Sequence, residues 1–81
     1  MFYSVTGNIV HIDASSVAVE CGGVAFKCSC SLNTLKKVGN IGSQTTLYTY
    51  LAVREDALEL FGFYDMNELD CFKLLIGISG V

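Results

Sequence analysis

The segment SVAVECGGVAFKCSC, residues 16–30, constrains the fold most, because a Gly-Gly pair divides two apolar, alternating runs. A two-residue turn at Gly22-Gly23 is typical of a β-hairpin whose central residues need positive φ. The turn also fixes which residues face each other: Cys21 with Val24, Val19 with Phe26, and Val17 with Cys28. All six then share one face, and Glu20 and Lys27 lie on the other, so we predict a hairpin with an apolar inner face.

The cysteines, Cys21, Cys28, Cys30 and Cys71, fit no zinc-binding spacing, and the only histidine, His11, is far from them in sequence. The hairpin register places the first three on the inner face, opposite valines and not opposite each other. We therefore expect reduced, buried thiols that serve as small apolar residues. We expect no metal and no cofactor.

Other segments predict three more strands and two helices. The strands are residues 2–12, with Gly7 marking a bend, 45–53 and 57–63. SLNTLKKVG, residues 31–39, predicts a short helix capped by Ser31 and stopped by Gly39. Asp65 opens a second helix, where Glu68 completes a capping-box pattern.

Alternation assigns side chains to faces within these segments. Tyr3, Val5 and Ile9 are expected to share one face of the first strand. In residues 45–53, alternation groups Leu47, Leu51 and Val53 on one face. The second helix places apolar residues at helical spacing: Met66, Leu69, Phe72 and Ile76.

This order of elements predicts a mainly β fold. A five-stranded OB-like barrel, with a short helix after strand three and a C-terminal helix, fits best because it closes most sheet edges within this length. A five-stranded open sheet with one helix is the alternative. The chain has 81 residues, which is enough for one domain.

The charge distribution narrows the class of function. The net charge is −3, which argues against a self-sufficient nucleic-acid binder with a basic surface. Six of the eight acidic residues lie between positions 55 and 70, and this cluster could simply be a solvated face. No segment has the length and purity of a membrane span, and the N-terminus lacks the features of a signal peptide, so we expect a cytoplasmic protein.

The run VREDALELFGF, residues 53–63, places Arg54, Glu55 and Asp56 between two apolar stretches, at the tip of an expected hairpin. Neighbours on a strand point to opposite faces, so these two carboxylates have poor geometry for acid–base catalysis. With His11 alone, no catalytic set is apparent, and we predict no catalytic residue. The acids are either a solvated turn or charges directed at a partner.

Four stretches together resemble the N-terminal domain of the RuvA family, Holliday-junction-binding subunits of a bacterial branch-migration complex. They are MFYSVTGNI, VECGGVAF, VREDALELFGF and LLIGISGV, and the resemblance covers all 81 residues. It implies an OB-fold domain over residues 1–64 and, over 65–81, the truncated start of a helix-hairpin-helix domain. We therefore expect more chain after Val81.

The resemblance also implies a function. The domain would form a homotetramer on four-way junction DNA, with Glu55 and Asp56 as an acidic pin at the crossover. Arg54 would contact a phosphate or neutralise Glu55, and Gly80 would approach a phosphate. Further partners would be a RuvB-type hexameric ATPase, bound through a domain absent here, and a RuvC-type resolvase.

The resemblance implies no catalytic activity of the chain itself, only an accessory role beside a separate ATPase. Two other hypotheses stay open on the residues alone. One is a stand-alone OB-like protein-interaction module without a DNA role, and the other is a small enzyme, which would need a pocket with converging polar groups.

Overall fold

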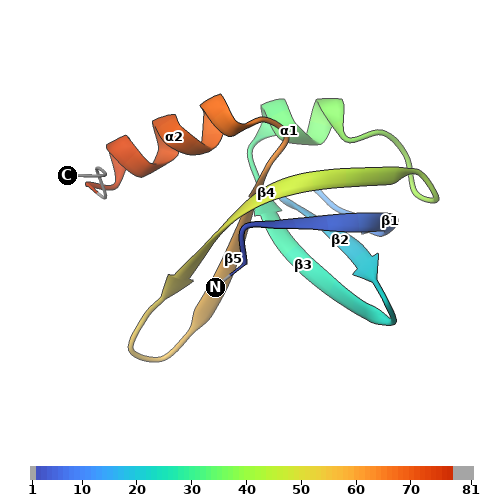
Figure 1. The fold of residues 1–81 in the computed structure, drawn as a ribbon, viewed down its shortest axis with the longest axis horizontal. Coiled ribbons are helices and arrows are strands. Elements are labelled where there is room, and N and C mark those ends of the chain that lie inside the picture. The colour runs from blue at the N-terminus through green and yellow to red at the C-terminus, as the bar shows by residue number, and fades with distance from the viewer. Residues whose placement is uncertain (1, 78–81) are drawn as a thin grey trace.

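The computed structural model describes residues 2–77, which form five strands and two helices (Figure 1). The elements are β1 (Ser4–Ile12), β2 (Ser16–Cys21), β3 (Val24–Cys30), α1 (Leu32–Lys37), β4 (Gln44–Val53), β5 (Leu58–Phe63) and α2 (Met66–Leu75). Each expected element is present, with boundaries shifted by a few residues.

The strands close into a barrel in the order β1-β2-β3-β5-β4. Neighbours are antiparallel except β3 and β5, which run parallel through the short pairing of Ser29 with Phe61 and Cys30 with Gly62. The five-stranded OB-like barrel is therefore confirmed, and the open sheet is wrong. In Figure 1, α1 lies at one end of the barrel and α2 leads away from it.

The hairpin register expected from Gly22-Gly23 is confirmed pair for pair: Cys21 faces Val24, Val19 faces Phe26, and Val17 faces Cys28. Both glycines have positive φ, 58° and 91°, as a two-residue turn of this kind requires. The inner face is apolar, and three of its residues are completely buried: Val17, Val19 and Cys28.

Gly7 has a steric role in addition to its place in a bent strand. A Cβ atom at this position would collide with the backbone carbonyl of Glu20 on β2. The β1–β2 register then shifts between Ile9 and His11, as in a β-bulge. The close approach of the two backbones explains why β1 carries a glycine here.

The structure contradicts one expectation about burial, that of Cys71, and shows which residues on the predicted strand faces are exposed. Of the residues expected to share one face of the first strand, Tyr3 precedes β1 and is 69% exposed, whereas Val5 and Ile9 are buried. Val53 is 67% exposed because β4 continues past the barrel into a projecting hairpin. Cys71 is exposed on α2.

The other three cysteines lie at the core: Cys28 is buried, and Cys21 and Cys30 are half-buried. All four cysteines are free thiols, as predicted. Neither helix in residues 2–77 has the length and apolar character needed to cross a membrane.

Candidate nucleic-acid interface

The β4–β5 hairpin carries the acidic residues singled out in the sequence. Its two strands pair from Tyr48 with Phe63 down to Val53 with Leu58. Figure 1 shows the hairpin extending away from both helices and ending in a loop. The backbone N–H of Arg54 donates to the Ala57 carbonyl at 2.8 Å, so only Glu55 and Asp56 form the tip.

Glu55 and Asp56 are both exposed. Within the described part of the chain, neither carboxylate has an ion pair or a side-chain hydrogen bond. No non-glycine residue in residues 2–77 has positive φ, so the tip backbone is one that any residue can adopt. Two uncompensated negative charges therefore stand at the outermost point of a projecting hairpin.

Arg54 turns back from the tip. Its guanidinium Nη1 lies 3.3 Å from a carboxylate oxygen of Glu59, and the described structure gives it no ion pair with Glu55. The other carboxylate oxygen of Glu59 accepts a 2.8 Å hydrogen bond from the hydroxyl of Ser29 on β3. The sequence left two roles open for Arg54, contact with a phosphate or neutralisation of Glu55, and in the structure its ion-pair partner is Glu59.

An apolar surface lies directly behind the tip. Val53 and Leu58 face each other across the hairpin and are 67% and 70% exposed. A groove of 390 Å³ continues from Val53 towards the end of α2, and its walls are Tyr50, Ala52, Val53, Arg54, Phe61, Phe72 and Ile76. Sequence alternation placed Val53 on the same strand face as Leu47, but it does not show that this face is exposed at Val53.

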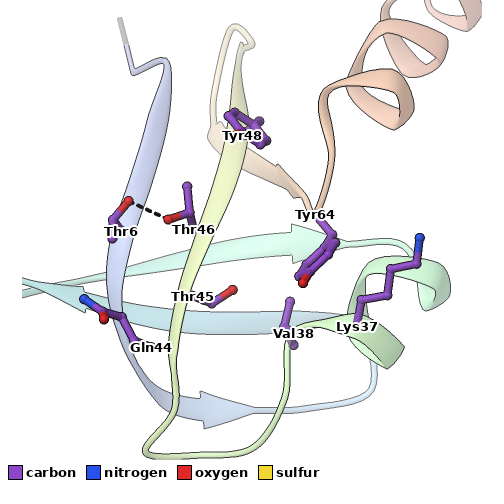
Figure 2. Close-up of a pocket in the computed structure, with 8 residues that line it drawn as sticks. All are labelled: Thr6, Lys37, Val38, Gln44, Thr45, Thr46, Tyr48 and Tyr64. Carbon is purple, nitrogen blue, oxygen red and sulfur yellow. Dashed lines mark hydrogen bonds between the residues drawn. The ribbon is translucent and has the colours of Figure 1, made fainter.

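A second, polar hollow lies between α1 and the β1–β4 pair. Figure 2 shows its lining residues, which surround 480 Å³: Thr6, Lys37, Val38, Gln44, Thr45, Thr46, Tyr48 and Tyr64. The Thr6 and Thr46 hydroxyls bond each other at 2.8 Å, and the Lys37 ammonium lies 3.7 Å from Asp65. These two pairs occupy the Thr6 and Thr46 hydroxyls and the Lys37 ammonium, and the hollow contains no histidine, cysteine or carboxylate among its described lining residues.

The cysteines do not form a reactive or metal-binding group. Burial, with smaller contributions from Cys30 and Cys21, raises the pKa of the Cys28 thiol to about 12. Burial and the nearby Glu68 carboxylate raise the pKa of Cys30 to about 11. Residues 2–77 contain no cluster of three or more His, Cys, Asp or Glu side chains suited to a metal ion.

Two other candidate residues can be placed. His11 is exposed, and its ring nitrogen Nε2 lies 3.9 Å from the Asp13 carboxylate. Gly80, which the sequence assigned to a phosphate contact, lies outside the described residues.

Comparisons with known proteins agree with the resemblance found in the sequence. Residues 1–62 match the family model described as the RuvA N terminal domain. Among curated relatives, the Holliday junction branch migration complex subunit RuvA of Chloroflexus aurantiacus is 48% identical over 81 residues. The proteins of the same name from Acetivibrio thermocellus and Chloroherpeton thalassium are each 41% identical over 81 residues.

These alignments include the whole chain but only 40% to 42% of each relative. The chain thus spans about two fifths of the length of the curated relatives it matches. The match to the family model and the closed barrel with its β4–β5 hairpin agree with each other. This chain belongs to the family of RuvA N-terminal domains.

Proposed function

We propose that this chain is the barrel domain of a non-catalytic subunit that binds Holliday junction DNA during branch migration. The observation that carries the proposal is the pair of uncompensated carboxylates, Glu55 and Asp56, at the tip of a projecting hairpin. The name shared by the relatives supports it, since each is a Holliday junction branch migration complex subunit.

Electrostatics explains how an acidic tip can serve a DNA-binding protein. Duplex DNA carries one phosphate charge per about 1.7 Å of helix axis. Carboxylates brought against phosphates repel them, and the repulsion grows where the gap excludes water. Glu55 and Asp56 therefore do not hold the DNA. They favour the open centre of a junction, where strands diverge, over a continuous duplex that would have to cross the tip.

A homotetramer would concentrate this effect by bringing four hairpins to one axis. The apolar groove behind the tip supports self-association, because a monomer exposing Val53 and Leu58 at 67% and 70% leaves apolar area in water. Packing against other copies would cover that area. The tips would then stand together where strands exchange.

The remaining parts of the proposal concern the rest of the subunit. Residues 65–81 would begin a helix-hairpin-helix domain, in which Gly80 approaches a phosphate. A hexameric ATPase of the RuvB type and a resolvase of the RuvC type would bind elsewhere on the assembly, in the cytoplasm. The chain itself would supply geometry and charge, with no cofactor.

The test is equilibrium binding of the full-length protein to a four-way junction and to a linear duplex of equal length. We expect tighter binding to the junction at low salt, and a preference that weakens as salt rises. Equal binding to both DNAs, or binding to neither, would contradict the proposal. The second outcome would favour the protein-interaction module.

A further inference from the structure

We propose that Glu59 is a positioning residue that holds Arg54 away from the acidic tip and so keeps the charges of Glu55 and Asp56 uncompensated. This inference rests on the proposed function, because it concerns how strongly the tip repels DNA. It concerns the side chains directly behind the tip.

The strand register brings Arg54 and Glu59 together. Arg54 lies opposite Ala57 through the 2.8 Å backbone hydrogen bond, and Glu59 is two residues further along β5. Side chains in this diagonal relationship lie on the same face of a hairpin and within reach of each other when they are long. The 3.3 Å distance from the Arg54 Nη1 to the Glu59 carboxylate follows from this register.

Ser29 fixes the orientation of the Glu59 carboxylate. Its hydroxyl donates to one carboxylate oxygen at 2.8 Å, and the opposite oxygen faces Arg54. The three side chains come from β3, β5 and the residue after β4. The Glu59 carboxylate thus draws Arg54 towards the barrel. Ser29, which orients this carboxylate, lies on β3 in the barrel wall.

The consequence is a difference in local charge. If Arg54 were free to fold over the tip, its positive charge would offset one of the two carboxylates and could also attract a phosphate. Paired with Glu59, it does neither. The pair is half-exposed, so its strength is that of a surface ion pair, which corresponds to about a 1.4-fold to fivefold bias in the position of Arg54.

A double-mutant cycle tests the inference. In the full-length protein, Glu59→Gln should raise the affinity for linear duplex at low salt by more than the loss of one negative charge explains. The same change in an Arg54→Gln background should raise the affinity only by the charge effect, which is smaller by up to about fivefold. Glu20→Gln on β2, also exposed, gives the effect of removing a negative charge far from the tip.

A charge-neutral variant separates positioning from net charge. Ser29→Ala removes the hydroxyl that orients Glu59 and alters no charge, so it should shift duplex affinity in the same direction as Glu59→Gln, and by less. Unchanged affinity in this variant would overturn the role of Ser29. Equal effects of Glu59→Gln with and without Arg54 would overturn the role of Glu59.

A readout without DNA keeps this inference separate from the proposed function. Nuclear magnetic resonance of the Arg54 side chain should show slower rotation of the guanidinium in the native protein than in the Glu59→Gln variant, because the ion pair restrains it. Equal rotation rates would overturn the inference even if the tip proves to repel DNA. Slower native rotation, with no effect of neutralising Glu55 and Asp56, would support the pair and contradict the proposed function.

Discussion

The Glu68 carboxylate on α2 accepts a 2.7 Å hydrogen bond from the hydroxyl of Thr34 on α1, a residue with no exposed surface. Its other oxygen accepts a 2.6 Å bond from the Ser31 hydroxyl, which caps α1 by accepting from the Thr34 N–H. The Thr34 hydroxyl also accepts from the Tyr64 N–H. One carboxylate therefore joins the start of α2 to the start of α1, and it does so where α2 leaves the barrel.

Replacing Glu68 should destabilise the fold. Glu68→Ala leaves the buried Thr34 hydroxyl without its acceptor, which should lower the free energy of unfolding by roughly 1–3 kcal/mol. Glu68→Gln keeps one acceptor oxygen and should cost less. Urea unfolding would measure both changes, with Glu20→Gln as an exposed control. A Glu68→Ala protein as stable as the native one would contradict this role.

Glu68 also shows what sequence reasoning could and could not reach. The capping-box pattern predicted that the side chains of Asp65 and Glu68 would cap α2 reciprocally. Half of it is present, because the Asp65 carboxylate accepts from the Glu68 N–H at 2.8 Å. The Glu68 side chain instead turns to Thr34, which is 34 residues away and not visible to a local pattern.

The hairpins show the same division between local and distant information. Gly22-Gly23 fixed the β2–β3 register because turn and alternation operate over adjacent residues. Alternation grouped Leu47 and Val53 on one face of β4, yet Leu47 is buried and Val53 is 67% exposed. The period of a strand does not indicate where the barrel beneath it ends. The pairing of Arg54 with Glu59 was missed for a related reason, since it needs the β4–β5 register.

The thiols should differ in reactivity according to burial. In the native protein at pH 8, a thiol reagent should modify Cys71 fastest, because it is exposed, and Cys28 slowest, because it is buried with a raised pKa. After denaturation without a reductant, the number of reactive thiols in residues 1–81 should be four. A count of two would show a disulfide and refute the pairing of the inner-face cysteines with apolar partners.

Stability should fall at alkaline pH. Burial raises the pKa of Cys28 to about 12 from an ordinary value of 9.0, so the folded state holds this proton more tightly than the unfolded state. The contribution is fully present below pH 9 and is lost progressively as pH rises towards 12. Denaturant midpoints at several pH values would measure the slope. Cys28→Ala should make the slope shallower, with Cys30, whose pKa is raised to about 11, supplying part of what remains. An equally steep slope in that variant would assign the loss to other groups.

Self-association should depend on the apolar surface behind the tip. Leu58→Ser removes an exposed apolar side chain, so it should barely change the stability of a monomer. If copies pack through this surface, the same change should shift the sedimentation profile towards smaller species. Val24→Ser, exposed on the opposite hairpin, is the matched control. Native protein that stays monomeric at high concentration would contradict the proposed tetramer.

The acidic tip gives the prediction that best separates a repulsive pin from a solvated turn. Glu55→Gln combined with Asp56→Asn removes two negative charges per chain without straining the backbone, which has negative φ at both positions. Linear-duplex affinity should rise by roughly twofold to thirtyfold, if each exposed like-charge contact costs about 0.2–1 kcal/mol. Junction affinity should rise less, so selectivity should fall.

The salt dependence of that variant decides whether charge is the cause. The gain in duplex affinity should be largest at low salt and should nearly vanish near 1 M, where the screening length is about 3 Å. The free energy of unfolding should change by no more than about half a kcal/mol, because the tip is exposed and the described structure gives its two carboxylates no hydrogen bond or ion pair to lose. Filter-binding or fluorescence anisotropy titrations at three salt concentrations would measure the trend. Unchanged duplex affinity at low salt, with the oligomer intact, would contradict the repulsive role and show that Glu55 and Asp56 form only a solvated turn.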